Sequence, residues 1–436
     1  MRIYKSINNY LYVISIILFC ICIYCKSFAQ DSDSTNEVIT PPEPETEDPD
    51  HMPHRMIGVN YGWASIGIGG IISVDGLDLI QDEASKQQVG DLTQYRGGEL
   101  TAARFVIFGH FGKNFPITYY TDMGYNGFEE GFDIVNDDEF SIYNLEFTFP
   151  MMGIGTLTIG KMKAPASLSR NWGGAYMPTA LRAAPISALT KSRDDGVRLT
   201  NTAFYKRMTW GVGVFNEWLT LGKSFNNTNT YVTGRVTVLV FDDRENRHLL
   251  QMGVGMRWTN SVENYVRFRS RPGVPTVPKY LDTGDMTGDK VTWLTGELAW
   301  RKRNLMITAE HVRTDVSSPT FGDPTFTGSY LWFEWTLTGE TRKWNYDSAL
   351  PGRPLPSKDF TKGGKGLWAL ALAVVDADLN EGLIDGGDMQ QVMIGINWYP
   401  QRSFRWGLHF NRTWLNRFGI KGTTDFLHLF LHVSNL

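Results

Sequence analysis

Apolar side chains occupy every second position in many segments of this chain, each about ten residues long. Leu250, Met252 and Val254, for example, alternate with Gln251 and Gly253. Neighbouring side chains of a β-strand point to opposite faces, so each such segment would have one apolar and one polar face. In a soluble sandwich the apolar face would cover a core. In a transmembrane barrel it would face lipid, and the polar face would line a watery lumen.

The alternation predicts sixteen strands whose connections alternate between short and long. Up-and-down barrels of bacterial outer membranes have short periplasmic turns and longer external loops. Residues 265–271 also alternate, but a seventeenth strand would put the chain ends on opposite rims, so we assign them to a ribbon within an external loop. Residues 339–365 fall on the periplasmic side, yet they form a long connection. The predicted strands are 65–76, 100–111, 115–125, 139–149, 154–163, 194–203, 208–218, 231–241, 249–258, 290–300, 304–313, 327–338, 366–376, 388–399, 403–412 and 424–434.

The polar faces of these segments include ionisable side chains, and this favours the barrel over the sandwich. Glu297 and Glu334, for example, occupy polar positions of predicted strands. An unpaired charge is costly in a dry core but costs little in a watery lumen. Closed barrels also satisfy every backbone hydrogen bond inside lipid. We therefore predict an all-β protein, a transmembrane antiparallel up-and-down β-barrel of about 16 strands that is wide enough for an aqueous channel.

The beginning of the chain has the layout of an export signal. Arg2 and Lys5 precede an apolar run from Leu11 to Tyr24, and Ala29 offers a cleavage site. The run is shorter than the roughly 20 residues that span a bilayer. All 3 cysteines lie within this signal, so the mature protein would have no disulfide and no thiolate metal site.

Residues 31–54 are rich in acidic residues and proline and contain no Lys or Arg, a composition that cannot pack a core. We therefore predict a signal peptide at 1–29, a disordered acidic leader at 30–55 and a barrel domain at 56–436. The barrel domain alone is close to electrical neutrality. Because nucleic-acid-binding domains carry a basic footprint, we expect no nucleic-acid partner.

The segment between the fifth and sixth predicted strands is basic, and residues 161–193 contain no Asp or Glu. It is also rich in Gly and Ala, which suits a loop packed inside a narrow lumen. Rings of Arg or Lys select anions in pores, so an inward fold would make this loop an anion-selective constriction. The alternative is a surface loop with scattered basic residues. The candidate constriction and anion-binding residues are Lys161, Lys163, Arg170, Arg182, Lys191 and Arg193.

A second basic pair extends this candidate path along the inner wall. If the hairpin between the eighth and ninth strands closes near Glu245, Arg235 lies opposite Gly255 and Arg257 is its diagonal neighbour. A register slip of one residue would instead point Arg257 at lipid. Inner-wall carboxylates such as Glu146 and Glu310 provide possible partners for these arginines.

Six short motifs occur in order along the chain: Gly160–Pro165, Met177 with Arg182, Arg193–Val197, Leu337–Glu340, Asp378–Asn380 and Ile396–Pro400. Together they resemble those of one known family, the phosphate-selective porins of types O and P. The resemblance extends from about Gly67 to the end of the chain. It implies a sixteen-stranded outer-membrane channel, often trimeric, whose constriction loop and basic residues guide phosphate. By position it supports Lys163, Arg182 and Arg193 as constriction residues.

Other functions find less support in the sequence. A barrel hydrolase would need a nucleophile, a base and an orienting group close together. His409, His428 and His432 lie on late strands, but the chain has no G-x-S-x-G motif. We expect no catalytic residue, no metal site and no cofactor. A structural or adhesive barrel would alternate in the same way and stays open as an alternative. The expected function is passive diffusion of small hydrophilic solutes across the outer membrane, with a preference for anions such as phosphate.

Overall fold

The computed structural model describes residues 57–113, 115–125, 140–217, 228–260 and 265–435. All of these belong to one compact unit, Arg55–Leu436. The predicted signal peptide and acidic leader lie outside the described residues. Among the described residues, no helix is both long and apolar enough to cross a membrane.

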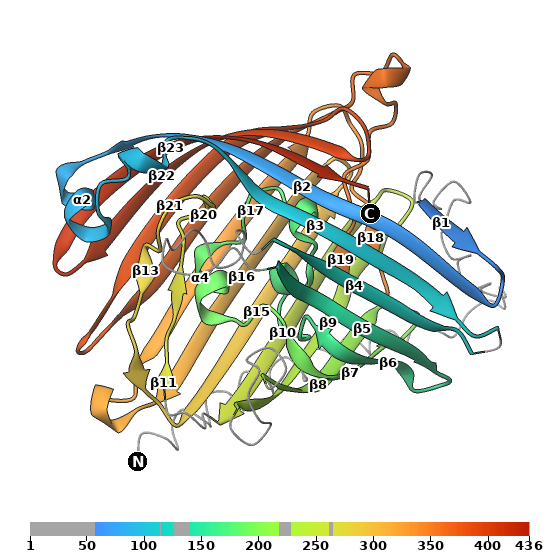
Figure 1. Cartoon of the computed structure of the whole chain (residues 1–436), viewed down its shortest axis with the longest axis horizontal. Coiled ribbons are helices and arrows are strands. Elements are labelled where there is room, and N and C mark those ends of the chain that lie inside the picture. Colours follow the sequence, from blue (N-terminus) through green and yellow to red (C-terminus); the bar gives the residue numbers. More distant parts are fainter. Residues whose placement is uncertain (1–56, 114, 126–139, 218–227, 261–264, 436) are drawn as a thin grey trace, which may run out of the picture. The chain divides into compact units, whose positions relative to one another are not determined.

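One antiparallel sheet forms a closed wall, in which each strand pairs with its neighbours in sequence and the last returns to the first (Figure 1). The seam between β23 and β2 runs in register from Ile71 opposite Ser434 to Gln81 opposite Thr424. The wall has sixteen strands, which confirms the predicted count and order. They are β2 (Ala64–Gln81), β3 (Gly97–Phe111), β4 (Ile117–Tyr125), β5 (Phe140–Met151), β6 (Gly155–Met162), β7 (Asp194–Ala203), β8 (Met208–Asn216), β9 (Thr230–Asp243), β10 (His248–Asn260), β15 (Lys290–Lys302), β16 (Leu305–Ser317), β17 (Thr325–Thr336), β20 (Leu367–Glu381), β21 (Ile384–Tyr399), β22 (Phe404–Arg417) and β23 (Ile420–Ser434).

Short elements decorate this wall. β1 (Ile57–Asn60) pairs with the part of β2 that extends beyond the end of β23. The segment 265–271 does not join the wall, as expected. Its strands β11 (Tyr265–Val266) and β12 (Arg269–Ser270) pair with β14 (Met286–Thr287) and β13 (Leu281–Asp282) of the same connection. The other short elements are α2 (Glu83–Val89), η2 (Thr93–Tyr95), α3 (Leu168–Asn171), η4 (Gly174–Tyr176), α4 (Ala184–Leu189), η6 (Pro319–Phe321), β18 (Trp344–Asn345), β19 (Leu350–Pro351) and η7 (Phe360–Lys362).

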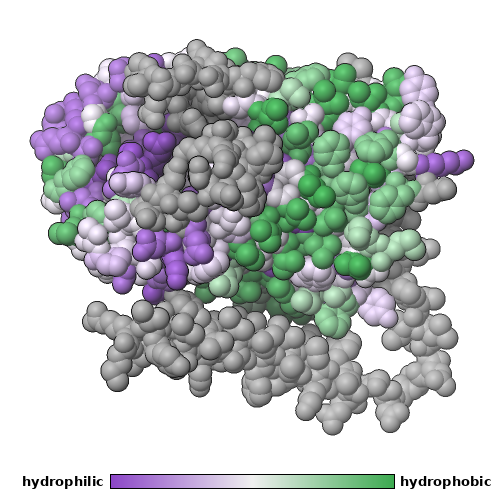
Figure 2. All heavy atoms as spheres, turned by 60° about the horizontal axis from the view of Figure 1, so that its bottom comes forward, coloured by the Kyte–Doolittle hydropathy of each residue, from purple (hydrophilic) through white to green (hydrophobic). Residues whose placement is uncertain are grey.

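The outer face of the wall is a band of exposed apolar side chains, visible as the green area of Figure 2. On β20, for example, Leu372 and Val374 are exposed while Ala371 and Ala373 are buried on the other face. Near the rim with the short turns, the band ends in a girdle of aromatic residues. Such girdles mark the boundary between lipid and water in outer-membrane barrels. The girdle consists of Trp300, Trp335, Trp368, Trp398 and Trp406.

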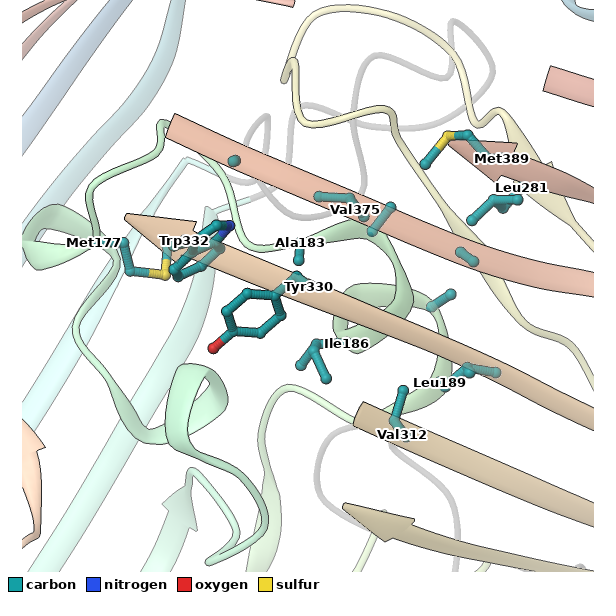
Figure 3. Close-up of a cluster of buried hydrophobic side chains, with 14 of the residues drawn as sticks. Met177, Ala183, Ile186, Leu189, Leu281, Val312, Tyr330, Trp332, Val375 and Met389 are labelled. Atoms are coloured by element: carbon teal, nitrogen blue, oxygen red, sulfur yellow. The ribbon is translucent and has the colours of Figure 1, made fainter. Parts of the chain in front are cut away.

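The inner wall is not polar throughout, which corrects the expectation drawn from strict alternation. Along β16, β17, β20 and β21 it is largely apolar, because connecting segments fold into the barrel and pack against it (Figure 3). Ile186 and Leu189 of α4 are fully buried beside Tyr330 and Val375 of the wall. This packing explains why the stretch around Leu367–Val375 is apolar at successive positions. One face of β20 meets the outer band, and the other meets the inserted loop.

The two faces of β20 lead to a stability prediction. We expect Leu372→Arg to reduce the free energy of unfolding in lipid by about 2–4 kcal/mol, because it places a charge in the apolar band. Asp376→Arg is the matched control, since Asp376 continues the same outer row beyond the band and should tolerate a charge. Urea titration of the protein folded in lipid vesicles measures both. Equal stability of the two variants would contradict a lipid-facing band.

Candidate functional site

The candidate site is the lumen of the barrel, narrowed by the connection between β6 and β7. This connection contains α3, η4 and α4, and α4 packs against the inner wall at β16, β17 and β20. We call residues 163–193 the inserted loop. The loop folds inward, as the sequence analysis expected.

A wall carboxylate holds the beginning of α3. Glu310 of β16 accepts hydrogen bonds from the backbone N–H groups of Leu168 at 2.8 Å and Ser169 at 2.9 Å. Tyr330 donates its hydroxyl to the same carboxylate at 2.7 Å. The first N–H groups of a helix have no hydrogen-bond partner within the helix, and they carry a partial positive charge. A carboxylate placed there accepts their hydrogen bonds and interacts favourably with that charge. Glu310 thereby fixes the inserted loop to the wall.

Other wall side chains grip the carbonyl groups of the same loop. Thr295 donates to the carbonyl oxygen of Ala166 at 3.0 Å, and Arg405 donates to that of Pro178 at 2.9 Å. A side chain at Gly255 would stand 1.8 Å from the Ala166 oxygen, so only glycine lets the loop lie this close to β10. The loop is thus fastened along its length.

Two of the predicted constriction residues brace the loop internally. Arg170 is buried, and its guanidinium donates to the Thr190 hydroxyl at 2.6 Å and to the carbonyl oxygens of Ile186 and Ser187. Arg182 donates to the carbonyl oxygen of Ser169 at 2.6 Å. Both arginines therefore make structural contacts within the inserted loop.

The basic residues at the two ends of the loop differ in position. Lys163 donates to the carbonyl oxygen of Trp172 at 3.0 Å, so it belongs to the inserted loop. Arg193 donates to the Asn144 side chain of β5 at 2.6 Å. Lys191 is more exposed and forms ion pairs with Glu217 and, at 4.0 Å, with Asp194.

Lys161 departs from the prediction. It lies on β6 two positions after the exposed Ile159, on the outer face, and pairs across strands with Asp195. Strand β6 continues through this position, so alternation directs Lys161 away from the lumen. It is not a lining residue.

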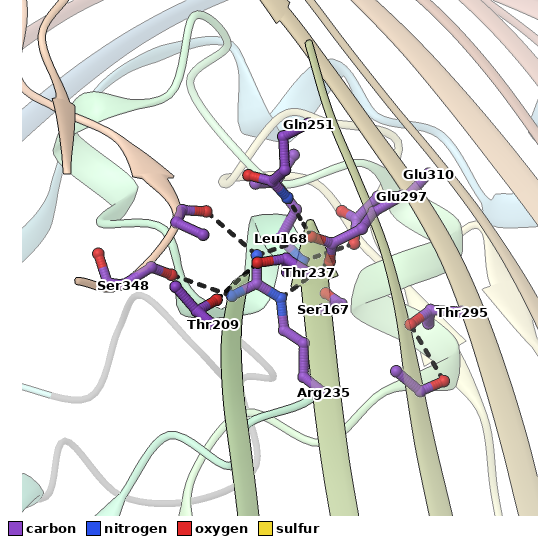
Figure 4. Close-up of polar contacts among 12 residues, drawn as sticks. Ser167, Leu168, Thr209, Arg235, Thr237, Gln251, Thr295, Glu297, Glu310 and Ser348 are labelled. Atoms are coloured by element: carbon purple, nitrogen blue, oxygen red, sulfur yellow. Dashed lines mark hydrogen bonds and ion pairs between the residues drawn. The ribbon is translucent and has the colours of Figure 1, made fainter. Parts of the chain in front are cut away.

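Arg235 and Arg257 both point inward. The structure pairs Gly255 with Arg235 and Arg257 with Thr233, the register that the hairpin predicted. Arg235 forms a bidentate ion pair with Glu297, at 2.7 and 2.9 Å (Figure 4). The Arg257 guanidinium lies 3.6 Å from the centre of the Tyr231 ring. The first arginine is held in an ion pair, whereas the second stacks on an aromatic face.

The long connection 339–365 also enters the barrel, through the short hairpin of β18 and β19. Arg235 donates to the carbonyl oxygens of Ser348 and Ala349 in this hairpin. Arg342 pairs with Glu334 of the wall and donates to the carbonyl oxygen of Tyr176 at 2.7 Å. The two inserted segments therefore meet inside the lumen.

The tyrosine of this hairpin stays neutral. Burial, with a smaller contribution from the Asp242 carboxylate, raises the pKa of Tyr346 to about 12. Its hydroxyl donates to Asp242 at 3.1 Å. At physiological pH the contact is therefore a hydrogen bond from a neutral phenol, and it ties the hairpin to the end of β9.

Several lumen arginines were not among the predicted residues, and Arg104 and Arg198 are two of them. Arg104 of β3 forms an ion pair with Asp122 at 3.2 Å. Arg198 of β7 lies 3.5 Å from Glu146 and donates to the carbonyl oxygen of Lys163. Both occupy inward positions of correctly predicted strands, so their alternation was the signal that could have identified them.

The described residues contain no cluster of His, Cys, Asp or Glu that could hold a metal ion. Hydrogen-bonded serine–histidine pairs do occur, and Ser73 with His432 at 2.6 Å is one of them. His428 bonds instead to Asp75, at 2.6 Å. No described serine, histidine and carboxylate are joined in one hydrogen-bonded chain, which is what a hydrolytic triad requires. The arrangement suits fixed charges along a path.

The hydrogen bonds of Glu310 to the inserted loop lead to a testable prediction. Glu310→Gln keeps the size of the side chain but loses the charge-assisted bonds to α3, at a cost of about 2 kcal/mol. The loop should then detach roughly 30-fold more often, and trypsin should cleave at Arg170 or Arg182 correspondingly faster. Glu381→Gln, an exposed carboxylate at the end of β20, is the control and should leave the cleavage rate unchanged. Equal rates for both variants would exclude the anchoring role.

Comparison with known proteins agrees with this geometry. Residues 81–414 match the family described as phosphate-selective porin O and P. A comparison with curated proteins finds no matching sequence. Among solved structures, the barrel is similar to an anion-selective porin from Comamonas acidovorans (TM-score 0.51, 12% identity, covering 85% of this chain and 99% of that one).

A second similar structure is the outer membrane channel DcaP of Acinetobacter baumannii (TM-score 0.51, 10% identity, covering 86% of this chain and 98% of that one). Identities this low establish the shared fold alone. The family match covers most of the chain, and it establishes the family to which the chain belongs. The chain belongs to the phosphate-selective porin O and P family, and it is a β-barrel porin of the bacterial outer membrane.

Proposed function

We propose that this porin is a passive channel for small hydrophilic solutes that prefers anions, phosphate-like anions among them, and that the inserted loop sets the preference. The observation that carries the proposal is the composition of this loop. Residues 163–193 narrow the lumen and contain basic residues but no acidic ones. The proposed lining cations on the loop are Lys163, Arg170, Arg182, Lys191 and Arg193, with Arg235 and Arg257 on the wall.

The wall carboxylates support this proposal because they are occupied. Glu297 is paired with Arg235, and Glu334 is paired with Arg342. Glu310 accepts backbone N–H groups of the loop. Carboxylates engaged in this way oppose an entering anion less than free ones would. The loop cations then act as fixed charges and donors that replace part of the hydration shell of a passing anion.

The proposal extends to processing and assembly. We infer that residues 1–29 are removed on export, that residues 30–55 remain as an acidic leader, and that the barrel assembles as a homotrimer in outer-membrane lipid. N-terminal sequencing of the protein purified from outer membranes should begin at Gln30. A mature chain that begins at Met1 would contradict cleavage.

Ion selectivity is the direct test of the anion preference. Under a KCl gradient across a planar bilayer, the reversal potential should have the sign of chloride preference. Arg182→Glu should reduce or invert it, and Arg193→Gln should reduce it, because both remove positive charge from the narrow part of the path. Lys161→Gln is the matched control, since it removes a positive charge from the outer face and should leave the potential unchanged. Cation preference that is unaltered by Arg182→Glu would overturn the proposal.

A further inference from the structure

A cavity of about 340 Å³ lies in the inner wall of β2–β5, near the rim with the short turns. We propose that it binds neutral hydroxylated solutes of the size of one or two sugar rings. The inference goes beyond the proposed anion preference, because it assigns a second class of solute to a separate part of the lumen. It rests on the protein being a channel but not on the charge of the inserted loop.

The chemistry of the lining is uncharged. Among the described residues, those that line the cavity include no Lys, Arg, Asp or Glu. Its inward-facing polar groups are instead the side chains of Ser65, His110, Thr118, Tyr120 and Thr148. Hydroxyl groups donate and accept at once, so they match the hydroxyl groups of a polyol. An anion would find no cation among these lining residues.

An aromatic platform forms part of the same wall. The ring of Phe108 lies over Gly67 of the neighbouring strand, and a side chain at Gly67 would stand 2.4 Å from the ring. Because position 67 has no side chain, the Phe108 ring can lie against the wall there. The Phe108 side chain is only partly buried. A ring in this position is suited to pack against the C–H groups of a sugar ring, and hydroxyl groups around it fix the orientation.

Charged groups begin just beyond the cavity and are paired with each other. Glu146 lies opposite Tyr120 in register and 3.5 Å from Arg198, while Asp122 pairs with Arg104. A solute that moves along this wall therefore passes from a neutral aromatic pocket to a charged zone. The volume of the pocket is within the range of about 300–1,000 Å³ that is typical of small-molecule sites.

Within the pocket, Ser65 and His110 are hydrogen-bonded to each other at 2.6 Å, and the hydroxyls of Thr148 and Thr158 are 3.2 Å apart. Tyr120 lines the pocket and faces Phe108 on the neighbouring strand. Tyr120 and Phe108 are the residues expected to contribute most.

The test is the single-channel current in KCl, with maltose added in increasing concentration on the side of the short turns. The current should fall along a saturating curve. Phe108→Leu keeps an apolar side chain but loses the ring face, and we expect a half-saturating concentration about tenfold higher. Tyr120→Phe loses one hydroxyl only, and about a fivefold increase is expected. Phe105→Leu is the matched control on the outer face of β3 and should leave the curve unchanged.

A polyethylene glycol of similar mass gives the reference for viscosity. If maltose lowers the current linearly and no more than this polymer does, the site does not exist. The site is also excluded if Phe108→Leu and Tyr120→Phe leave a saturating curve unaltered. Reversal potentials recorded on the same channels separate this result from the anion preference, because neither variant changes a charge.

Discussion

The constraint on which this structure depends is the pairing of every backbone N–H and C=O group that faces hydrocarbon. Within lipid no water is present to satisfy these groups, so a sheet that crosses the membrane must close. Here closure is made by β2 and β23, whose register runs without interruption from Ile71 with Ser434 to Gln81 with Thr424. Once the sheet is closed, alternation sends one half of the side chains outward to lipid and the other half into a single lumen.

The lumen of a barrel this wide would be open water unless the chain filled part of it. Connections from both rims serve this purpose, and the wall provides their anchors. Besides the inserted loop and the hairpin of β18 and β19, the connection between β10 and β15 packs inside the barrel, where Tyr280 and Leu281 are buried. Glu310 holds the inserted loop, and Arg235 holds the hairpin of β18 and β19. Arg342 reaches both segments. The charged side chains that hold the inserted segments would otherwise repel or bind a solute in the lumen. The packing of these segments therefore also affects the selectivity of the channel.

Strand positions were predictable from sequence, because a strand with an apolar environment on one face and a polar one on the other has a hydrophobic period of two. The register of Arg235 with Gly255 followed from the same rule and from a short hairpin. Lys161 was wrongly predicted to line the lumen, because the prediction rested on the positive charge of the whole segment 161–193. Its position at the end of β6, where alternation still applies, was not considered.

The contacts that shape the lumen lay beyond sequence reasoning. Glu310 contacts Leu168 across more than a hundred residues, and no local pattern marks such a pair. In the sequence, the stretch around Leu367–Val375 is apolar at successive positions, which indicates that both faces of β20 are covered. The segment that covers its inner face could not be identified from the sequence alone. The connection 339–365 was recognised as too long for a periplasmic turn. Its inward fold depends on Arg235 and Arg342, whose partners are set by the closed wall.

The central claim is that the apolar outer face of this wall contacts lipid, while a water-filled path remains inside the barrel. Electrical recording of the purified protein in a planar bilayer tests it most directly. The account predicts discrete upward steps of current, each proportional to voltage, as single barrels insert. Protein that inserts and folds in the bilayer, yet carries no ionic current at any voltage, would contradict it.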